Sequence, residues 1–397
     1  MRIDFVHSIN EVSSTDWNLL WSTDYPFVRH EFLLALEESD CTTAHAGWQP
    51  FHCLAWDGAR LLGALPLYLK THSYGEYVFD WSWADAYHQA GYDYYPKLLN
   101  AIPFTPATGP RWALSADLSA ADKQHLMRDL FAAAAQRMAQ NALSGLHCLF
   151  PSSTDAAHLQ SLPNLMQRLD CQFHWFNQGY TSFDDFLQTF SSRKRKNLSK
   201  ERARVQEQGF KVQMTEGAEL CRADWQHFYQ LYRRTYRKRS GHDGYLTEAF
   251  FQQLGAAIPE QIVMAQAWRD GHWCAAALYF RDSTTLYGRY WGALEEYDAL
   301  HFECCYYQGV EYAIHQQLRR FDPGAQGEHK IARGFTPVLT QSFHYLQQPG
   351  FASAVKRFLA EEQAHVHAYC HVAREQLPFK DGCPVVPVDY LLADQPT

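Results

Sequence analysis

The sequence lacks the paired cysteines that mark many metal and redox sites. It contains 10 cysteines in 397 residues, but no two of them are spaced as CxxC, and only Cys304 and Cys305 are adjacent. Zinc ribbons and thiol oxidoreductases depend on such pairs, so the scattered pattern disfavours both classes. In a chain of this length the pattern predicts reduced, mostly buried thiols in a cytoplasmic protein.

Three common nucleotide-binding and hydrolase motifs are also missing. GxGxxG, GxxxxGK[ST] and GxSxG do not occur, which removes the usual signals of Rossmann, P-loop and α/β-hydrolase proteins. An excess of positive charge is missing too, because the formal net charge is −8. Any binding of polyanions must therefore depend on a local basic patch.

Long apolar runs are absent as well. The most promising stretch, at 61–69, is too short to span a bilayer. Near the N-terminus Asp4, His7 and Glu11 interrupt any apolar core of a signal peptide, so we expect a soluble protein without a cleaved leader. The apolar fraction of 47% is ordinary for a packed globular protein, and 397 residues suffice for two or three domains.

A pattern of strands occurs twice. Residues 50–70 predict a strand, an Asp57-Gly58 turn and a partner strand, and residues 263–282 predict the same hairpin with a second Asp-Gly turn. Trp56 and Trp268 occupy matching places and lie 212 positions apart.

Aromatic strands are then predicted at 76–83 and 285–292, where Trp83 and Trp291 lie 208 positions apart, and a helix is predicted at 301–318. Two landmarks at nearly one offset favour duplication of an α/β unit. A helix is also predicted at 121–140, with Leu126, Leu130, Ala134 and Met138 one turn apart.

A basic helix is predicted between the two copies. Arg193, Lys196, Lys200 and Arg204 are spaced so that they form one stripe, with Ser191 or Ser192 as the cap and Gly209 at the end. Cations at a helix N-terminus bind phosphate well. The alternative is a solvated charged face that binds nothing.

The residues from 321 to 335 combine glycines with chemically active side chains. Glu328, His329, Lys330 and Arg333 place an acid, an imidazole and two cations within six positions. Acyl transfer to an amine needs a base for the released proton and donors for the oxyanion. Both kinds of group are present here, although many surface turns also contain them.

Two further groups combine aromatic with acidic residues. In the second half, Arg289 could hold an anion, and the candidate pocket residues are Tyr290, Glu296, His301 and Glu303. In the first half the candidates are Asp80, Trp81, Trp83 and Asp85. Such residues can line a polar pocket, or the aromatic rings can be core and the acids hydrogen-bonded or solvated.

A histidine-rich segment near the C-terminus resembles a metal site only superficially. His367 and His371 lie four residues apart on a predicted helix, which is suitable spacing for zinc. The segment reads HVHAYCH rather than HExxH, so we predict no metal site.

Three stretches carry a family resemblance. Residues 191–210 resemble the basic helix of the acyl-CoA N-acyltransferase (GNAT) superfamily, and residues 321–337 resemble its late glycine-rich motif ending in a lysine. Residues 70–111 resemble a signature of the FemAB-like group within that superfamily, which is linked to peptidoglycan. The three stretches together span most of the chain.

The resemblance implies an α/β (α+β) fold of two tandem GNAT-like domains with mixed, mostly antiparallel sheets, which we assign to residues 1–185 and 186–397. It implies transfer of an acyl or aminoacyl group to an amine, possibly of a cell-wall precursor. Arg193 and Lys196 would contact phosphates of the donor or acceptor, and we predict that Lys200, Arg289 and Arg333 also take part in binding them. Lys330 would neutralise negative charge at the reacting carbonyl or at a phosphate, with Glu328 and His329 as the predicted pair for proton transfer.

The donor is left open between acyl-CoA and aminoacyl-tRNA as a co-substrate, with no tightly bound cofactor. Acyl-CoA enzymes of this superfamily hold the pyrophosphate with a Gln/Arg-x-x-Gly-x-Gly/Ala loop, and the nearest match, residues 289–294, fails at its last position. The departure is compatible with a tRNA donor, although unrelated backbone amides can bind phosphate equally well. The alternatives are a non-catalytic ligand-binding or RNA-binding module and a metal-dependent hydrolase, and the oligomeric state is open.

Overall fold

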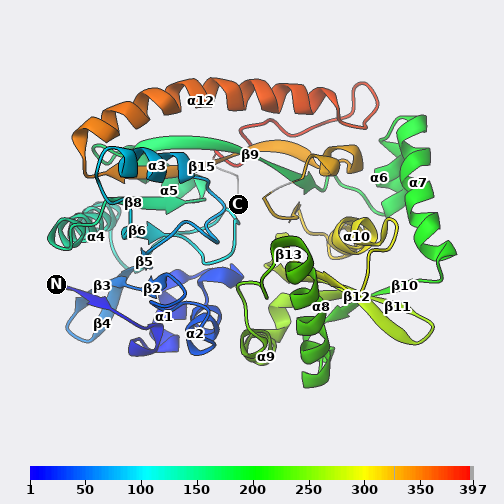
Figure 1. The fold of residues 1–397 in the computed structure, drawn as a ribbon, viewed down its shortest axis with the longest axis horizontal. Coiled ribbons are helices and arrows are strands. Elements are labelled where there is room, and N and C mark those ends of the chain that lie inside the picture. Colours follow the sequence, from blue (N-terminus) through cyan, green and yellow to red (C-terminus); the bar gives the residue numbers. More distant parts are fainter. Residues whose placement is uncertain (326, 394–397) are drawn as a thin grey trace. The chain divides into compact units, whose positions relative to one another are not determined.

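The computed structural model describes residues 1–325 and 327–393 (Figure 1). The chain forms two compact units. Unit 1 comprises Met1–Cys171, Leu339–Ala368 and the described residues from Asp389 onward, and unit 2 comprises Gln172–Val338 and Tyr369–Val388. The predicted α/β class with mixed, mostly antiparallel sheets is confirmed in each unit.

The division differs from the predicted domains, because the chain returns to unit 1 after residue 338. Strand β15 (Thr336–Leu346) pairs through Ser342–Leu346 with β8 (Gly145–Leu149) of unit 1. Residues 339–368, assigned from sequence to the second domain, therefore belong to unit 1. The pairing partner of a C-terminal strand is a long-range choice that local sequence does not specify.

Unit 1 has one antiparallel sheet and one mixed sheet. The antiparallel sheet has the order β1-β3-β4-β7, from Arg2–Val6, His52–Asp57, Arg60–Leu65 and Ala113–Leu114. The second sheet contains β15, β8, β6, β5 and β2 in that order, the last three being Lys97–Asn100, Tyr68–Lys70 and Trp48–Pro50. Strands β6 and β8 are parallel, whereas β15 with β8, β6 with β5, and β5 with β2 pair antiparallel.

The helices of unit 1 pack on these strands. They are α1 (Ser14–Trp21), α2 (His30–Glu38), α3 (Trp81–Gln89), α4 (Ala120–Gln140) and α5 (Ser153–Gln160). The predicted apolar stripe of α4, from Leu126 to Met138, is buried against the core with Cys53, Leu65 and Leu146. Helix α12 (Pro349–Glu375) contributes residues to both units.

The sheet of unit 2 has the order β10-β11-β12-β13-β14-β9. In the same order, its strands are Lys211–Glu216, Ile262–Arg269, His272–Arg281, Thr285–Ala293, Arg320–Asp322 and Met166–Phe176. The last of these, β9, begins in unit 1, and unit 2 contains it from Gln172 onward. Within it only β13 and β14 pair in parallel.

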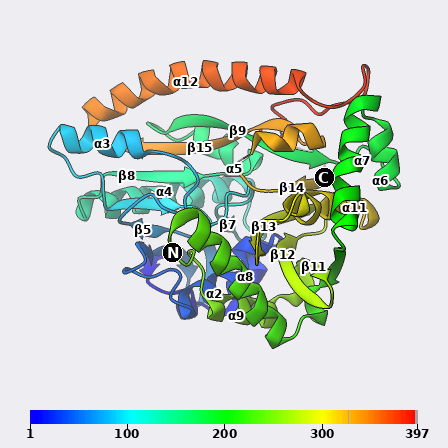
Figure 2. The same ribbon diagram turned by 45° about the vertical axis from the view of Figure 1, so that its right-hand side comes forward.

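Helices cover both faces of the unit 2 sheet. Helix α8 (Arg222–Ser240) packs on β12, β13 and α9 (Glu248–Ala257) (Figure 2). Gly309 of α11 (Gln308–His315) packs against Tyr279 and Phe321 on the other face. A π-helical turn, Glu303–Tyr307, joins α10 (Leu300–Phe302) to α11. Helices α6 (Phe183–Gln188) and α7 (Ser192–Glu207) precede β10, and a 3-10 helix spans Glu328–Arg333.

The predicted repeat is confirmed at the hairpins. Each unit contains a strand, two helices and an antiparallel hairpin, and the first strand pairs with the hairpin. Arg2 lies opposite Trp56 in unit 1, and Lys211 lies opposite Trp268 in unit 2. Both hairpins also change register immediately before the tryptophan. Shared pairing and a shared bulge position favour descent of the two units from one α/β unit.

The second predicted match of the repeat, Trp83 with Trp291, is wrong. Residues 76–83 were predicted as a strand, but Trp83 lies in helix α3 whereas Trp291 lies in strand β13. The aromatic residues imitate the alternation of a strand. Trp83 and Tyr87, four residues apart, instead bury one side of a helix.

Most of the ten cysteines are buried, as the sequence predicted. Among the helices of residues 1–325 and 327–393, none combines the length and apolarity that a bilayer crossing requires.

Candidate functional site

The candidate site in unit 2 lies where its two parallel strands end. Strands β13 and β14 pair only from Thr285 with Arg320 to Tyr287 with Asp322. Beyond this point β14 ends and the chain turns at Gly324, whose φ of +95° suits a glycine. Strand β13 continues past a register shift that leaves Arg289 as an extra residue opposite β12. The ends of parallel strands are common ligand sites because neighbouring chains diverge there.

An inner cavity of about 100 Å³ lies at this point. Arg289, Tyr290 and Trp291 line it from β13, and Ala277, Leu278 and Tyr279 line it from β12. The remaining lining residues are Gly288, His301, Cys305, Tyr306 and Pro323. The predicted pocket residues Tyr290 and His301 are therefore brought together, and the predicted anion-binding Arg289 lies beside them.

The guanidinium of Arg289 is already held by a carboxylate. Its Nη2 donates to Oδ2 of Asp322 over 2.9 Å, and both side chains are 1% exposed. Burial would raise the pKa of Asp322, but Arg289 and a hydrogen bond from the N–H of Gly324 hold it well below its usual range. Arg289 is thus a buried ion pair rather than an open anion site. Burial also lowers the pKa of His174 to about 3, so this imidazole is neutral.

Lys330 lies behind the same turn. It is 1% exposed, and its Nζ donates to the carbonyl oxygen of Gly324 over 2.6 Å. Burial lowers the pKa of Lys330 to about 7, and although Asp322 counteracts this, the charge of Arg289 adds to it. A large share of this lysine is therefore neutral at neutral pH.

The two residues before Lys330 contact different partners. Nε2 of His329 lies 2.8 Å from Oη of Tyr306, which lines the inner cavity. Burial and the charges of Lys330 and Arg333 lower the pKa of His329 to about 4, so the ring is neutral at neutral pH. Glu328 is exposed and accepts a hydrogen bond from Oη of Tyr369.

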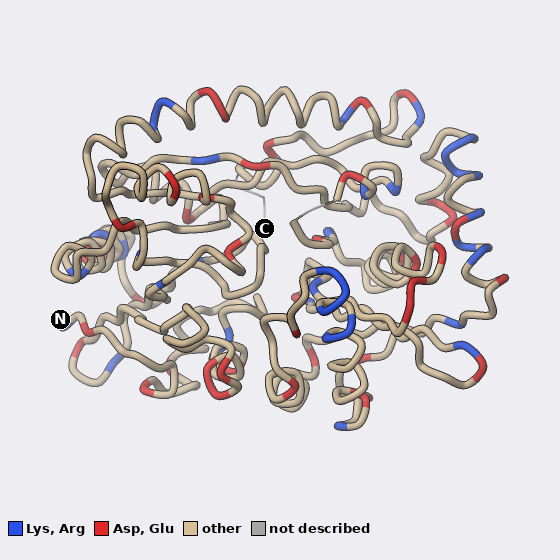
Figure 3. The backbone as a smooth tube through the Cα atoms, viewed as in Figure 1, with Lys and Arg blue, Asp and Glu red and all other residues tan. Residues whose placement is uncertain are grey.

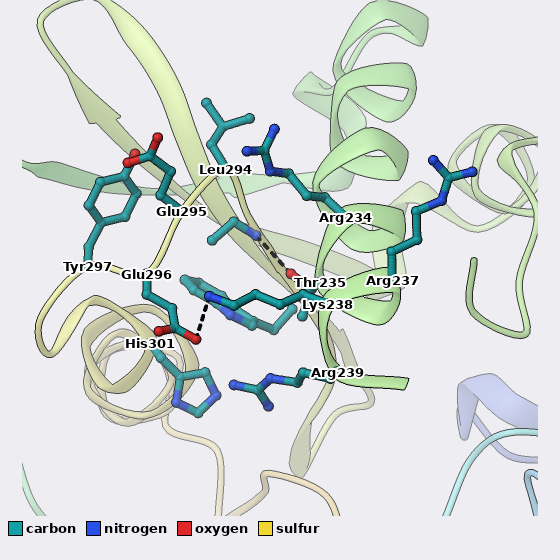
Figure 4. A pocket seen from close by; sticks show the side chains of 12 residues that line it. Arg234, Thr235, Arg237, Lys238, Arg239, Leu294, Glu295, Glu296, Tyr297 and His301 are labelled. Carbon is teal, nitrogen blue, oxygen red and sulfur yellow. Dashed lines mark hydrogen bonds and ion pairs between the residues drawn. The ribbon is translucent and has the colours of Figure 1, made fainter. Parts of the chain in front are cut away.

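A larger outer pocket of about 580 Å³ adjoins the cavity, since Trp291 and His301 line both (Figure 4). One wall is the C-terminal end of α8, and the other is the segment that follows β13. The residues from α8 are Arg234, Thr235, Arg237, Lys238 and Arg239, and those after β13 include Glu295, Glu296 and Tyr297.

The cations of the outer pocket differ in their partners. Arg237 pairs with Asp243, and Lys238 Nζ lies 2.7 Å from Oε1 of Glu296. Arg234 and Arg239 have no ion-pair partner in the part of the chain that the structure describes. Figure 4 shows Arg239 directed toward His301. Burial, followed by the charge of Arg239, lowers the pKa of His301 to about 3.

Sequence reasoning missed these arginines. The signal was visible, because five cations occur within residues 233–239. A basic run at a helix C-terminus is also what the helix dipole favours, so it does not by itself indicate a ligand site.

Two other predicted residues of the site form structural ion pairs. Arg333 donates to both oxygens of Glu201, 2.8 and 2.9 Å away, and stacks 3.4 Å over the ring of Phe302. Glu303 is 5% exposed and is paired with Arg202 over 2.8 Å. Glu296 pairs with Lys238, but both side chains are largely exposed. Arg333 and Glu303 are therefore committed to neighbours in the protein.

The predicted basic helix is present as α7, and Gly209 follows it with a φ of +82°. Arg193, Lys196 and Lys200 are exposed, and no ion pair involves them within the described ranges. Figure 3 shows lysine and arginine along this helix. The stripe is therefore available to an anion, whereas Arg204 pairs with Asp298.

In unit 1 the predicted aromatic and acidic group divides between core and surface. Asp80 is 2% exposed and accepts hydrogen bonds from Lys97 and Tyr94, at 2.5 and 2.6 Å. Trp83 is buried and packs edge-on against His344. Trp81 and Asp85 are exposed on α3. Asp80 is therefore a hydrogen-bonded acid and Trp83 is a core ring, which is the second of the two possibilities that the sequence left open.

The histidines at the C-terminus are exposed on α12. Among the described residues, no three His, Cys, Asp or Glu side chains are grouped so that they could hold a metal ion.

Comparison with known proteins identifies a family. Residues 8–381 match the FemAB-like family, described as peptidoglycan biosynthesis/recognition. Similar solved structures include FemX, at 12% identity over 89% of this chain and 100% of that one, with a TM-score of 0.49. L-PGS from Bacillus licheniformis shows 12% identity over 86% and 98%, with a TM-score of 0.46. A tandem GNAT protein of the clavulanic acid pathway shows 10% identity over 88% and 99%, with a TM-score of 0.40. The search of curated proteins found no match.

Proposed function

Because the chain belongs to the FemAB-like family, we propose that it transfers an acyl or aminoacyl group from an activated donor to an amine. The observation that carries this proposal is that two pockets lie next to each other in unit 2. The outer pocket offers Arg234 and Arg239 without ion-pair partners, and the inner cavity adjoins it through Trp291 and His301. Acyl-CoA and aminoacyl-tRNA both carry phosphates at one end and a reactive carbonyl at the other. Arginine is well suited to bind such phosphates.

The reaction requires one proton acceptor. The amine nitrogen attacks the carbonyl carbon, the bond to the thiolate or to the tRNA oxygen breaks, and the leaving group takes up one proton as the amine loses one. We assign the acceptor to His329, because its low pKa keeps the imidazole neutral and Tyr306 links it to the cavity wall. A group with this pKa is a weak base, but it can relay a proton between amine and leaving group.

Lys330 supports the site from behind. Its bond to Gly324 holds the turn that follows Pro323, and Pro323 lines the inner cavity. We propose that Lys330 positions this wall and that its charged fraction adds to the positive field that stabilises the oxyanion. Glu328 bonds Tyr369 and would act only through that contact.

The exposed stripe on α7 would bind further phosphates of the donor. Arg193, Lys196 and Lys200 are free to do so, and a tRNA would engage such a stripe more fully than CoA would. The acceptor would be a small amine or a cell-wall precursor. Because both donors are cytoplasmic molecules, the reaction would take place in the cytoplasm.

Thermal melting of the purified protein tests the proposal. The ligands are acetyl-CoA, longer acyl-CoAs, free CoA, uncharged tRNA and aminoacyl-tRNA. A ligand at a hundred times its Kd should add about 2.7 kcal/mol to the free energy of unfolding. We expect stabilisation by one donor class, weakened in Arg239→Gln and retained in Arg233→Gln, which removes an equal charge from α8 outside the pocket.

A turnover assay completes the test. Release of free CoA or free tRNA in the presence of a panel of amines should depend on both donor and amine. Stabilisation by RNA without any release would instead indicate the RNA-binding alternative. If no donor stabilises the protein and none is consumed, the proposed function is wrong.

A further inference from the structure

Asp322 is the last residue of β14, and its side chain is buried. Its backbone lies opposite Tyr287, at the last paired position of the parallel strands β13 and β14. Asp322 is not one of the residues that line the inner cavity, but its carboxylate bonds residues from both chain segments that continue beyond this position. The carboxylate therefore connects the two segments where their strand pairing ends.

The first of these segments is β13. Nη2 of Arg289 donates to Oδ2 of Asp322 over 2.9 Å, and its Nη1 lies 3.4 Å from Oδ1. The register shift in β13 leaves Arg289 outside the regular pairing with β12, so the strand ladder alone does not fix its direction. The contact with both oxygens of Asp322 fixes the guanidinium, and Arg289 lines the inner cavity.

The second segment is the turn that follows β14. Oδ1 of Asp322 accepts a hydrogen bond from the N–H of Gly324 over 2.9 Å. The carbonyl oxygen of Gly324 in turn accepts a hydrogen bond from Nζ of Lys330 over 2.6 Å. Gly324 is thus held from both sides, and the preceding residue, Pro323, lines the inner cavity. One buried carboxylate therefore fixes two parts of the cavity wall.

The charge of Asp322 also acts on Lys330. Burial lowers the pKa of Lys330 to about 7, the carboxylate of Asp322 opposes this shift, and the charge of Arg289 adds to it. Removal of the carboxylate should therefore lower the pKa of Lys330 further, whereas removal of the guanidinium should raise it. The two members of one ion pair thus have opposite expected effects on the same lysine.

We propose that Asp322 is a positioning residue of the unit 2 site, which holds Arg289 and the Pro323–Gly324 turn in place and, through this turn, Lys330. It acts through these residues and not by contact with the reacting groups. The inference rests on the proposed function, in which Lys330 supports the oxyanion and the outer pocket binds the phosphates of the donor. Asp322 should therefore affect turnover more than donor binding.

Asp322→Asn tests this role, because it keeps the size of the side chain and removes its charge. With the donor and amine found by the melting and turnover assays, we expect kcat to fall about 10- to 100-fold and KM for the donor to change less than about threefold. Glu76→Gln is the matched control, since it also takes a carboxylate from a buried ion pair, that with Lys97 in unit 1. Its kcat should remain at the wild-type value.

The pH dependence of kcat/KM separates positioning from general destabilisation. The part of the profile that Lys330 contributes is identified by its loss in Lys330→Gln. Because Lys330 is charged mainly below about pH 7, this contribution declines as the pH rises. The decline should move to lower pH in Asp322→Asn and to higher pH in Arg289→Met.

A double variant provides for the case that Asp322→Asn does not fold. Combined with Arg289→Met, it removes both charges of the ion pair, so that no unpaired charge of this pair stays buried. Its kcat should be lower than that of Arg289→Met alone, because Gly324 and Lys330 still lack the carboxylate. Equal kcat values for these two variants would contradict the inference.

The remaining outcomes are also decisive. Wild-type kcat and an unshifted profile in Asp322→Asn overturn the inference and leave the proposed transferase activity intact. An equal fall of kcat in Glu76→Gln, or a profile that moves in the same direction in Asp322→Asn and Arg289→Met, overturns it as well, because either result indicates only a loss of stability. A wild-type protein without turnover refutes the proposed function, and the inference fails with it.

Discussion

Each unit buries a lysine beside its pair of parallel strands, but the pKa values of the two lysines are shifted in opposite directions. In unit 1, Lys97 is 0% exposed and lies 2.8 Å from Glu76 and 2.5 Å from Asp80. Burial alone would lower its pKa, but the two carboxylates raise it to about 12. In unit 2, Lys330 bonds a backbone carbonyl, and its pKa is lowered to about 7. Equal burial thus accompanies opposite pKa shifts, because only Lys97 contacts carboxylates.

The ends of the parallel strands also differ between the two units. In unit 1, β6 ends at Asn100, whose Nδ2 bonds the carbonyls of Pro66 and Arg111. Arg111 is 1% exposed and donates to the carbonyls of Leu149, Pro110 and Ala107. In unit 2 the corresponding end opens into the inner cavity. Both units therefore contain one pair of parallel strands, but the end of β6 is filled by hydrogen-bonded polar side chains, whereas a cavity lies at the end of the β13–β14 pair.

The largest expected effect is on the free energy of unfolding when Lys97 is changed. Lys97→Met leaves Glu76 and Asp80 buried without their cation, which should cost about 3–5 kcal/mol. Lys330→Met loses one bond to a carbonyl, worth about 1–2 kcal/mol, but it also removes a buried lysine whose pKa is lowered, so it should not destabilise the protein at pH 7.5. Urea unfolding at pH 7.5 measures both values.

A compensated variant controls for general disruption at Lys97. Lys97→Met combined with Glu76→Gln and Asp80→Asn removes the unpaired charges and should recover part of the loss. Equal losses for Lys97→Met and Lys330→Met would refute the difference in ionisation.

The next effect is the pH dependence of stability. The folded-state pKa of Lys330, about 7, lies below the value of about 10.4 in an unfolded chain. Between pH 7 and about pH 10.4, the unfolded state binds more protons at Lys330 than the folded state does. The contribution of Lys330 to the free energy of unfolding therefore rises with pH. From pH 7 to pH 9.5, the wild type should gain on the order of 3 kcal/mol relative to Lys330→Met.

Lys97 should show the opposite pH dependence and serves as the control, because its pKa is raised in the folded state. Its contribution is complete below about pH 10.4 and declines only as the pH rises toward 12. Chemical unfolding at a series of pH values gives both curves. A wild-type curve parallel to that of Lys330→Met would show that Lys330 is fully charged.

A smaller effect is expected for donor binding at the outer pocket of unit 2. Arg239→Gln should weaken donor binding about tenfold, or 1.4 kcal/mol, because one unpaired cation of the outer pocket is lost. Its unfolding free energy should change by less than about 0.5 kcal/mol, since Arg239 is exposed. Titration calorimetry with the donor found by melting measures the affinity, and Arg233→Gln is the control. Unchanged affinity in Arg239→Gln would place the phosphates elsewhere.

The smallest effect on stability is expected on α7. A Lys196→Ala, Lys200→Ala double variant should change the free energy of unfolding by less than about 0.5 kcal/mol, because both side chains are exposed. If the donor is a tRNA, the salt dependence of its affinity should become shallower by about 1.4 to 1.8 in log-log slope. An unchanged slope would show that α7 does not contact the RNA.

Local patterns predicted several elements correctly. The Asp-Gly turns located both hairpins, and the spacing of Leu126, Leu130, Ala134 and Met138 located α4, since turn chemistry and helical period act over a few residues. The same reasoning failed at Trp83, where aromatic alternation imitated a strand and four-residue spacing was the better indication.

The candidate site was predicted only in part. Arg289, Tyr290 and His301 were singled out and line the inner cavity, whereas His329 and Lys330 contact Tyr306 and Gly324. Their roles stay predictions. Whether such a residue is open to a ligand depends on its partner. Arg289 with Asp322, Arg333 with Glu201 and Glu303 with Arg202 are pairs separated by 33 to 132 positions, so local sequence does not reveal them.

The sequence by itself determined the class of fold, the repeated hairpin, the basic helix and the family, because each depends on residues close together in the chain. Only the tertiary structure decided which cations have a counter-ion among the residues that it describes. It also decided the charge of each buried lysine, since Lys97 and Lys330 differ through contacts with Asp80, Glu76 and Gly324. Desolvation and ion pairing act through space, and the fold determines which side chains meet.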